Sequence, residues 1–374
     1  MPRDNLATVG LSHPPLSAAW RRIARRRLLS WYDRHARDLP WRRSPSLYRV
    51  WVSEIMLQQT QVATVETYFR RFLKAFPNVR SLATAEEEQV LRLWEGLGYY
   101  RRARQLHQAA QIIVREYGGR FPRELDAVRQ LPGVGRYTAG AIVSIALDAR
   151  APILEANTVR LWSRLLAFRG DPTKAAGQRL LWDAAEQILP RRLIGDVNQA
   201  LMDLGSQICT PRRPACDVCP LATLCAAHLT GSQDSIPRPT AKQVFVDVRE
   251  AAVVVRRRGE VLLRRYAPGQ RWAGLWDFPR FALETAAGAD VREEVIEKVR
   301  GQTGVLVDPG EHLTTIKHGV TRYRITLDCH VAKYVSGRTR SGNGAVLKWV
   351  QPAALADYPL STTGRKLARL VWPG

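Results

Sequence analysis

The spacing of the apolar residues changes once along the chain, and this change limits the folds that the chain can adopt. Up to about residue 227, apolar residues recur at intervals of three or four, the period of an amphipathic helix. Examples of this spacing are Trp51, Ile55, Val62, Val65, Phe69 and Phe72. After residue 243, runs such as VFVDVREAAVVV and RYRITLDCHVAKYV have the composition of strands. The chain is therefore predicted to form an all-α domain followed by an α+β domain.

Four segments follow from this change and from the length of 374 residues, which exceeds what one hydrophobic core usually holds. Residues 1–17 contain scattered Pro and Gly without a period and are expected to be a flexible leader. Residues 18–227 are expected to form the helical domain. Residues 228–242 are polar and contain Gly and Pro, so they are expected to link it to the second domain, 243–374.

The chain carries a strong positive charge. Its 57 Lys and Arg residues against 34 Asp and Glu residues give a formal net charge of +23. A charge of this size attracts polyanions, so nucleic acid is the leading partner. The balance of 45% hydrophobic and 24% charged residues excludes a largely disordered chain. We find no run long enough to cross a membrane and no signal peptide, so we expect an intracellular protein.

Four of the five cysteines lie within 17 residues. Cys209, Cys216, Cys219 and Cys225 have the spacing C-x6-C-x2-C-x5-C, so one loop can wrap four thiolates around one centre. In a reducing cytosol this pattern favours metal binding over disulfides. Four thiolates suit zinc as well as a [4Fe–4S] cluster, and the ligand type leaves both open. Cys329 stands apart and is interpreted as an ordinary interior residue.

A glycine-containing turn, LPGVG at residues 131–135, precedes the apolar run from Tyr137 to Leu147. Gly133 and Gly135 allow a tight turn that exposes backbone N–H groups at a helix N-terminus, and such a turn binds phosphate. A plain helix–helix turn is the alternative that these five residues leave open.

Two carboxylates stand out for their surroundings. Glu54 is the only charged residue between Arg49 and Glu66. Burial among its apolar neighbours would raise its pKa and allow it to act as a general acid. Glu155 lies in the segment PILEAN, just past the apolar run that follows the turn. The alternatives are the polar face of an amphipathic helix for Glu54, and a helix cap or surface acid for Glu155.

In a basic chain with such a turn, two carboxylates fit the cleavage of a glycosidic bond in DNA. One acid protonates the departing group, and the other stabilises a cationic sugar. Because the base must leave the helix, other side chains have to hold the duplex open. Gln58, Gln59, Tyr99 and Tyr100 are candidates for this contact with DNA, and core packing or a plain surface position is the alternative.

Together these motifs resemble one family, the adenine DNA glycosylases of the MutY type, which belong to the helix-hairpin-helix family with endonuclease III. The resemblance covers most of the chain and includes the four cysteines. Its strongest segments are LPW at 39–41, VWVSEIMLQQTQVATV at 50–65, LWEGLGYYRRARQLH at 93–107, LPGVGRYTAGAI at 131–142 and NQALMDLGSQICT at 198–210. The resemblance implies a six-helix barrel domain beside an iron–sulfur domain, with the active site between them. It also favours a [4Fe–4S] cluster over zinc.

The resemblance implies a role for each matching residue. Glu54 matches the general acid that protonates the adenine ring and later helps to activate water. Tyr137 and Asn157 match residues that help to hold the catalytic carboxylates and the cationic intermediate. Gln59 and Tyr99 match side chains that enter the base stack when adenine flips out.

The turn matches the family, whereas one carboxylate departs from it. Gly133 and Gly135 match the phosphate-binding hairpin. At Glu155 the family pattern is Asp-Gly-Asn, and this chain reads Glu-Ala-Asn. The carboxylate is retained but is longer by one methylene. The extra methylene could move the charge by about 1.5 Å, which matters where catalysis depends on placement.

The second domain resembles the MutT-like (Nudix-fold) reader of 8-oxoguanine in this family, through RWAGLWDFP at 271–279 and HGVTRY at 318–323. The latter loop has Val-Thr-Arg where the family usually has Phe-Ser-His. Thr321 therefore retains the hydroxyl and is expected to contact DNA. Gly301 and Gln302 stand where a Nudix hydrolase has metal-binding glutamates, so recognition without nucleotide hydrolysis is expected.

The sequence thus predicts a monofunctional glycosylase that removes adenine mispaired with 8-oxoguanine or guanine and leaves an abasic site. We expect it to act on double-stranded DNA as a monomer, in a bacterial cytoplasm, associated with the nucleoid and not with a membrane. One alternative is a thymine or uracil mismatch glycosylase, against which the long C-terminal domain argues. The other is a catalytically silent mismatch-binding protein, motivated by Glu155. Position 137 carries Tyr where lyase relatives have Lys, so strand cleavage is not expected.

Overall fold

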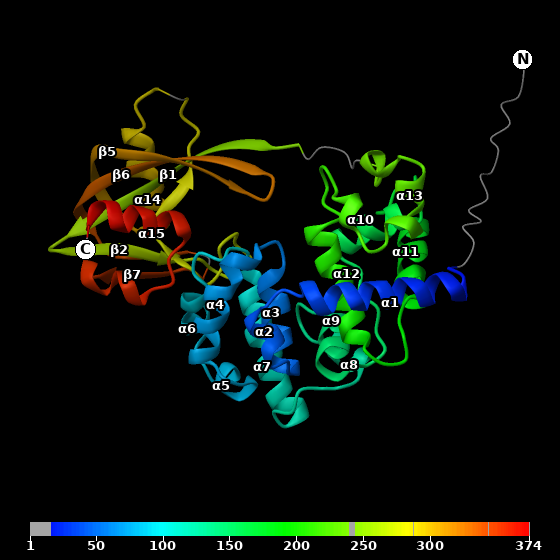
Figure 1. The fold of residues 1–374 in the computed structure, drawn as a ribbon. Coiled ribbons are helices and arrows are strands. Elements are labelled where there is room, and N and C mark those ends of the chain that lie inside the picture. Colours follow the sequence, from blue (N-terminus) through cyan, green and yellow to red (C-terminus); the bar gives the residue numbers. More distant parts are fainter. Residues whose placement is uncertain (1–15, 239–243, 287, 343, 374) are drawn as a thin grey trace, which may run out of the picture. The chain divides into compact units, whose positions relative to one another are not determined.

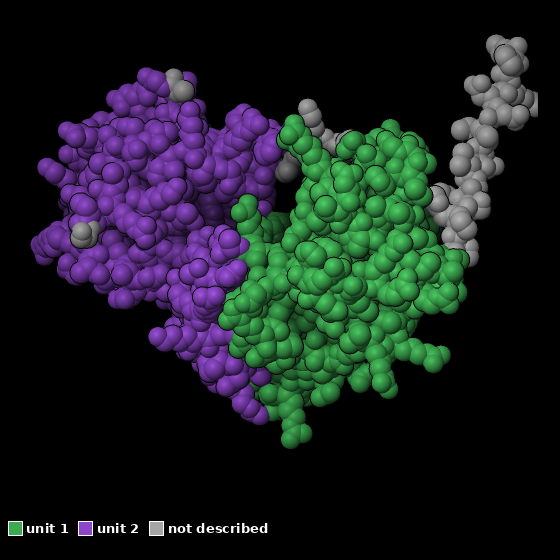
Figure 2. All heavy atoms as spheres, viewed as in Figure 1, with its two compact units in different colours: residues 1–62, 112–241 green, residues 63–111, 242–374 purple. Residues whose placement is uncertain are grey.

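The computed structural model describes residues 16–238, 244–286, 288–342 and 344–373. Most of the expected leader and the last part of the expected linker therefore lie outside the described residues. The chain groups into two compact units, coloured separately in Figure 2. Unit 1 comprises residues 1–62 and 112–241, and unit 2 comprises residues 63–111 and 242–374. In the described part of the chain, no helix is long and apolar enough to cross a membrane.

Unit 1 is helical (Figure 1). Its helices are α1 (Ala18–His35), α2 (Pro40–Arg43), α3 (Leu47–Leu57), the end of α7 (Arg101–Tyr117), α8 (Leu125–Arg129), α9 (Arg136–Leu147), α10 (Ala156–Leu165), α11 (Ala175–Gln187), α12 (Ile194–Gln207) and α13 (Ala226–Leu229). Helix α12 lies against α1, α9 and α10. Its glycines permit this approach, because a Cβ at Gly195 would lie 2.6 Å from the carbonyl oxygen of Ser144 and one at Gly205 would lie 3.0 Å from that of Asn157.

Unit 2 combines helices with a sheet. Its elements are α4 (Val62–Ala75), α5 (Val79–Ala83), α6 (Glu87–Trp94), the start of α7, β1 (Val246–Arg257), β2 (Glu260–Arg265), β3 (Trp276–Asp277), β4 (Arg280–Ala282), α14 (Arg292–Thr303), β5 (Val305–Val320), β6 (Tyr323–Gly337), β7 (Val346–Val350) and α15 (Thr362–Val371). Within the described residues the strands form one seven-stranded sheet of order β3-β2-β1-β6-β5, with β4 beside β1 and β7 beside β2. Strands β1 and β6 are parallel, and the other named pairs are antiparallel.

Alternation along β1 explains how this sheet is covered. Val254 faces the cluster that contains Leu367 of α15, whereas Val253 and its alternate neighbours face the cluster that contains Val295 of α14. Because successive strand residues point to opposite faces, the two helices cover opposite faces of the sheet (Figure 1).

Helix α6 attaches to the sheet part of unit 2 through two ion pairs, one of them buried. The carboxylate of Glu95 accepts two hydrogen bonds from Arg365, at 2.6 and 3.0 Å, and both side chains are largely buried. Glu88 accepts from the guanidinium of Arg265 at 2.9 Å and from the indole of Trp276 at 3.0 Å. These contacts explain why residues 63–111 group with the C-terminal part of the chain and not with the other helices.

The first part of the expected linker is folded onto the helical part of the chain. Helix α13 continues past residue 227, and Ile236 is buried. The Nε group of Arg164 donates to the carbonyl oxygens of Gln233 and Ile236, at 2.9 Å each. Residues 228–236 therefore pack onto α10, because backbone carbonyls and one isoleucine supply contacts that their polar composition does not indicate.

Candidate active site

Glu54 is the most buried of the predicted site residues. It lies in α3, its side chain is almost fully enclosed (3% exposed), and its Oε2 accepts a hydrogen bond of 2.7 Å from the hydroxyl of Tyr137. Burial raises the pKa of Glu54 to about 7, and the charge of Glu155 adds to this, whereas the Tyr137 hydrogen bond and Arg42 oppose it. The carboxyl is thus not on a solvated helix face, and near neutral pH a large fraction of it is protonated.

Glu155 is the N-cap of α10. Its carboxylate accepts from the backbone N–H groups of Asn157 (2.9 Å) and Thr158 (3.0 Å), and its own N–H donates to the Thr158 hydroxyl, which completes a capping box. Its charge contributes to raising the pKa of both Glu54 and Tyr137, so it lies within electrostatic range of them. The alternative of a helix cap therefore describes its position correctly, and the cap fixes the position of the carboxylate.

Asn157 is fixed on both sides. Its amide Nδ2 donates to the Glu155 carboxylate at 3.2 Å, and its Oδ1 accepts from Arg160 at 2.9 Å. Because a guanidinium only donates, this contact orients the amide. Arg160 also donates to the carbonyl oxygens of Gly205 (2.6 Å) and Cys209 (2.7 Å). Arg160 was not predicted, because nothing in the sequence distinguishes it from the other basic residues.

A cavity beside Glu54 is lined by residues to which the sequence motifs assigned no role. Its lining includes Trp41, Arg42 and Gln199. Arg42 is held in place by Asp203, whose fully buried carboxylate accepts from it at 2.7 and 3.0 Å. The segment LPW at 39–41 carried part of the family resemblance without an assigned role, and the contribution of Gln199 depends on the packing of α12 and has no local signal.

The turn between α8 and α9 has the geometry of an anion site. Gly133 has φ +78°, and Gly135 is the N-cap of α9 without a side chain that caps its N–H groups. These N–H groups are therefore available to a phosphate.

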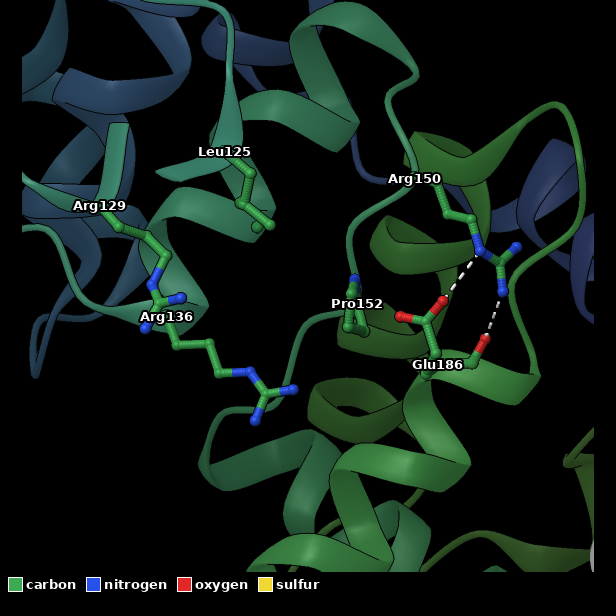
Figure 3. Close-up of a pocket in the computed structure, with 7 residues that line it drawn as sticks. Leu125, Arg129, Arg136, Arg150, Pro152 and Glu186 are labelled. Atoms are coloured by element: carbon green, nitrogen blue, oxygen red, sulfur yellow. Dashed lines mark hydrogen bonds and ion pairs between the residues drawn. The ribbon is translucent and has the colours of Figure 1, made fainter. Parts of the chain in front are cut away.

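Arginines flank this turn. Arg129 ends α8, Arg136 begins α9, and both line a pocket with Arg150 and Glu186 (Figure 3). Arg150 is paired with Glu186 at 2.8 Å, whereas the guanidinium of Arg136 lies 3.8 Å from the ring centroid of Trp182. The pocket therefore adds positive charge next to the hairpin.

Three residues expected to contact DNA share an unusual backbone. Gln59, Tyr99 and Thr321 are exposed and have φ values of +57°, +49° and +51°. Side chains other than glycine rarely adopt this region, and such strain is concentrated at functional sites. Gln58 instead caps α3 and donates to Thr138 at 3.4 Å. Tyr100, the fourth candidate, is buried, and its hydroxyl accepts from a backbone N–H.

Within unit 2, Tyr99 and Thr321 line one cavity of about 480 Å³, which we name the reader cavity. Its walls come from the start of α7, the loop before β3, the turn between β5 and β6, and the start of α15. Its lining residues include Tyr99, Arg101, Arg104, Arg271, Tyr323 and Lys366. The sequence predicted single contacts here but not a shared cavity, because the two halves are about 200 residues apart.

The four clustered cysteines line a cavity with Arg164, whose Nη1 donates to the sulfur of Cys209 at 3.3 Å. No set of three or more His, Cys, Asp or Glu side chains in the described ranges is placed to enclose one metal ion. Thiols arranged around a cavity instead fit an iron–sulfur cluster, whose cysteines bind separate irons. The cluster would hold the loop 209–225 together when bound, and none of the candidate catalytic residues belongs to that loop.

Family models match three parts of the chain. Residues 52–187 match the HhH-GPD superfamily base excision DNA repair proteins, residues 209–225 match the iron-sulfur binding domain of endonuclease III, and residues 251–370 match the NUDIX domain. Among solved structures, a thermostable thymine-DNA glycosylase is 29% identical with a TM-score of 0.52, covering 56% of this chain and 97% of its own. The expected fold class is confirmed.

Curated relatives identify the family. The adenine DNA glycosylase of Rattus norvegicus is 34% identical over 92% of this chain and 77% of its own length. That of Buchnera aphidicola subsp. Schizaphis graminum is 38% identical over 68% of this chain and 74% of its own length. The human enzyme is 42% identical over 68% of this chain, which spans about half of its length. The chain belongs to the adenine DNA glycosylase family, and with it to the helix-hairpin-helix enzymes of base-excision repair that hydrolyse N-glycosidic bonds and carry a [4Fe–4S] cluster.

Proposed function

We propose that the protein hydrolyses the N-glycosidic bond of adenine mispaired with 8-oxoguanine or guanine and leaves an abasic site. The observation that carries this proposal is Glu54, a buried carboxyl with a pKa of about 7 that is bonded to Tyr137 and lies close to a second carboxylate. Such a pair of acids in unlike environments can divide the roles of proton donor and fixed charge.

Glu54 is the proton donor. It transfers its proton to a ring nitrogen of adenine, the C1′–N9 bond breaks, and the electron pair leaves with the base. The sugar then carries the positive charge. Water attacks C1′, and the Glu54 carboxylate accepts a proton from that water, which restores the acid. Tyr137 orients the Glu54 carboxyl through its hydrogen bond.

Glu155 and Asn157 stabilise the cationic sugar. The carboxylate is held by three hydrogen bonds from its own helix N-terminus, so its charge is in place before the reaction starts. Trp41 and Gln199 line the cavity beside Glu54, whose volume is about 20 Å³, so it has to widen before adenine can stack on Trp41 and bond with Gln199.

The remaining candidates are proposed to contact DNA. The hairpin with Gly133 and Gly135 binds a phosphate, Gln59 and Tyr99 enter the base stack with Gln58 beside them, and Thr321 reads the base opposite adenine. The exposed, left-handed positions of three of these residues support the assignment. We also propose that a single chain acts, since both carboxylates come from one unit, on the DNA of a bacterial cytoplasm, in keeping with its charge of +23.

Two reactions are not expected. A lyase needs an amine for a Schiff base, and Tyr137 has none. Nucleotide hydrolysis by the Nudix-like domain needs metal-binding carboxylates, whereas Gln302 is an amide that donates to the carbonyl oxygen of Arg280 at 3.0 Å.

A thymine or uracil mismatch glycosylase is the second candidate, favoured by the similarity to a thymine-DNA glycosylase structure. A panel of duplexes with A opposite 8-oxoguanine, A opposite G, T opposite G and U opposite G distinguishes the candidates. We expect base release from the two adenine duplexes only, and strand breaks only after alkali. Release of thymine or uracil in preference to adenine would support the second candidate, and no release at all would support a silent binding protein.

A further inference from the structure

The reader cavity gathers positive charge without a carboxylate. Arg101, Arg104, Arg271 and Lys366 line it, and among the described residues no Asp or Glu does. Burial lowers the pKa of His318, which also lines the cavity, and the charges of Arg280 and Lys366 add to this. Like charges held together repel one another, so an anion would stabilise this arrangement.

Two of the four cations already donate hydrogen bonds to other groups of the protein. Arg271 donates to Glu250 at 3.1 Å, and its guanidinium lies 4.5 Å from the ring centroid of Tyr323. Arg104 donates to the backbone carbonyl of Ala273. These two arginines therefore build the wall of the cavity.

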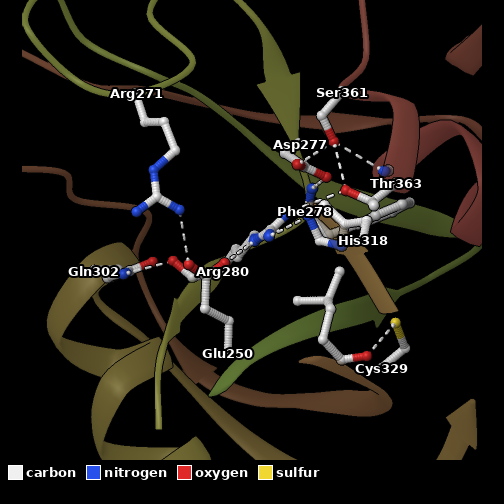
Figure 4. A network of polar contacts seen from close by, with 12 residues as sticks. Glu250, Arg271, Asp277, Phe278, Arg280, Gln302, His318, Cys329, Ser361 and Thr363 are labelled. Atoms are coloured by element: carbon white, nitrogen blue, oxygen red, sulfur yellow. Dashed lines mark hydrogen bonds and ion pairs between the residues drawn. The ribbon is translucent and has the colours of Figure 1, made fainter. Parts of the chain in front are cut away.

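A buried polar network supports this wall (Figure 4). The second oxygen of Glu250 accepts from Arg280 at 2.5 Å. Arg280 also donates to the hydroxyl of Thr363 at 2.9 Å and to His318 at 3.3 Å. Arg271, on the cavity side, is thus attached to a carboxylate that cannot turn away, because another arginine holds it.

The other two cations are free to bind. Arg101 and Lys366 are exposed, and neither forms an ion pair with a carboxylate in the parts of the chain that the structure describes. Their backbones are nevertheless anchored. Arg101 begins α7, and Lys366 follows Arg365, whose guanidinium is fixed by the buried Glu95. Two charges from distant parts of the sequence are therefore presented to one cavity on rigid helices.

We propose that Arg101 and Lys366 together bind one backbone phosphate of the DNA strand that carries 8-oxoguanine. The proposal rests on the proposed function, because Tyr99 and Thr321, the expected DNA contacts, line the same cavity. A guanidinium and an ammonium suit phosphate oxygens, and the ring of Tyr323 and the Thr321 hydroxyl suit the nucleotide next to it. Such a contact positions the strand without reading its sequence.

Measurements of DNA binding at several salt concentrations test the proposed phosphate contact. The full-length protein is titrated with a duplex in which 2′-fluoroadenosine, which resists cleavage, lies opposite 8-oxoguanine. We expect Arg101→Ala and Lys366→Ala each to weaken binding by a factor on the order of ten. Each should also reduce the slope of log K against log salt by about 1. Lys366→Arg should restore both values. Arg369→Ala is the matched control, because Arg369 is exposed on the same helix but lines another cavity.

Neutral linkages locate the phosphate. When single phosphates of the 8-oxoguanine strand are replaced by methylphosphonates, one position should weaken binding of the wild type but not of the Arg101→Ala/Lys366→Ala protein. The proposal would be overturned if Arg101→Ala and Lys366→Ala had the same salt slope as the Arg369→Ala control. It would also be overturned if the double variant responded to a methylphosphonate at every position as the wild type does. Loss of 8-oxo-dGMP binding with an unchanged DNA slope would assign the cavity to a free nucleotide and overturn it as well. Wild-type protein that shows the expected profile but releases no adenine would contradict the proposed function alone.

Discussion

The pair of carboxylates in unit 1 and the reader cavity in unit 2 are opposite electrostatic arrangements. Glu54 and Glu155 are acids withdrawn from water, and each is held by hydrogen bonds from its neighbours. The reader cavity presents four cations, of which only Arg271 forms an ion pair with a carboxylate among the described residues. The first arrangement raises the pKa of an acid, whereas the second presents positive charge that attracts an anion.

This difference separates two tasks. A proton donor has to be kept from bulk water so that its pKa rises toward neutrality. A reading surface has to stay open, because the DNA strand must enter and leave it. We therefore expect changes in the carboxylate pair to alter the rate on every substrate, and a change at Thr321 in the reader cavity to alter the choice between substrates.

The largest effect is expected for Glu54→Gln. The amide has nearly the same shape but cannot deliver a proton, so the single-turnover rate of adenine excision should fall by roughly 10³-fold or more. DNA affinity, measured in parallel by anisotropy, should stay within a few-fold of the wild type. Substantial remaining excision would show that another group is the acid.

Glu155→Gln should lower the excision rate by about two orders of magnitude, because a fixed charge near a developing cation supplies several kcal/mol. Glu155→Asp is the matched control. It keeps the charge and, being a good N-cap residue, the cap of α10, so it should retain measurable activity. Thermal unfolding of both variants separates loss of the cap from loss of the charge. Wild-type rates for Glu155→Gln in a folded protein would remove this carboxylate from the mechanism.

The rate of excision should fall at alkaline pH. The pKa of Glu54 is raised to about 7, and the acid is active only while protonated. The single-turnover rate should therefore be nearly constant well below pH 7 and then decline, approaching about tenfold per pH unit above it. A rate that is flat from pH 6 to pH 9 would not be compatible with Glu54 as the proton donor.

The smallest effect is expected for Thr321→Ala. Loss of one hydrogen bond, worth about 1 kcal/mol, should reduce the preference for 8-oxoguanine over guanine opposite adenine by roughly fivefold. Thr321→Ser, which keeps the hydroxyl, should behave like the wild type. Equal losses in both variants would assign the effect to the strained backbone at this position (φ +51°) and not to the hydroxyl.

Sequence alone could predict the parts of the site whose signals are local. Glu54 is a single charge in an apolar helix, and the four cysteines have a characteristic spacing. The change of period near residue 240 likewise indicated the fold class, because helices and strands place apolar residues at different intervals. Glu155 was ambiguous for a physical reason: a helix cap and a catalytic charge use the same short segment before a helix.

What could not be predicted depends on contacts between distant segments. Arg160 connects Asn157 to the end of α12, and Gln199 reaches the cavity beside Glu54 from that same helix. The attachment of α6 to the sheet depends on Glu95 and Arg365, which are 270 residues apart. No period or motif encodes such pairs, because each is created only when the helices pack.

The central claim is that the carboxylate pair cleaves the glycosidic bond and that Thr321 recognises 8-oxoguanine. It is tested most directly by single-turnover kinetics on two duplexes, with adenine opposite 8-oxoguanine or opposite guanine. The wild type, Glu54→Gln and Thr321→Ala are compared on both. The account predicts that Glu54→Gln loses excision from both duplexes by the same large factor. It predicts that Thr321→Ala loses rate only on the 8-oxoguanine duplex. Excision by Glu54→Gln at a rate near the wild type on either duplex, or an equal loss on both duplexes in Thr321→Ala, would contradict it.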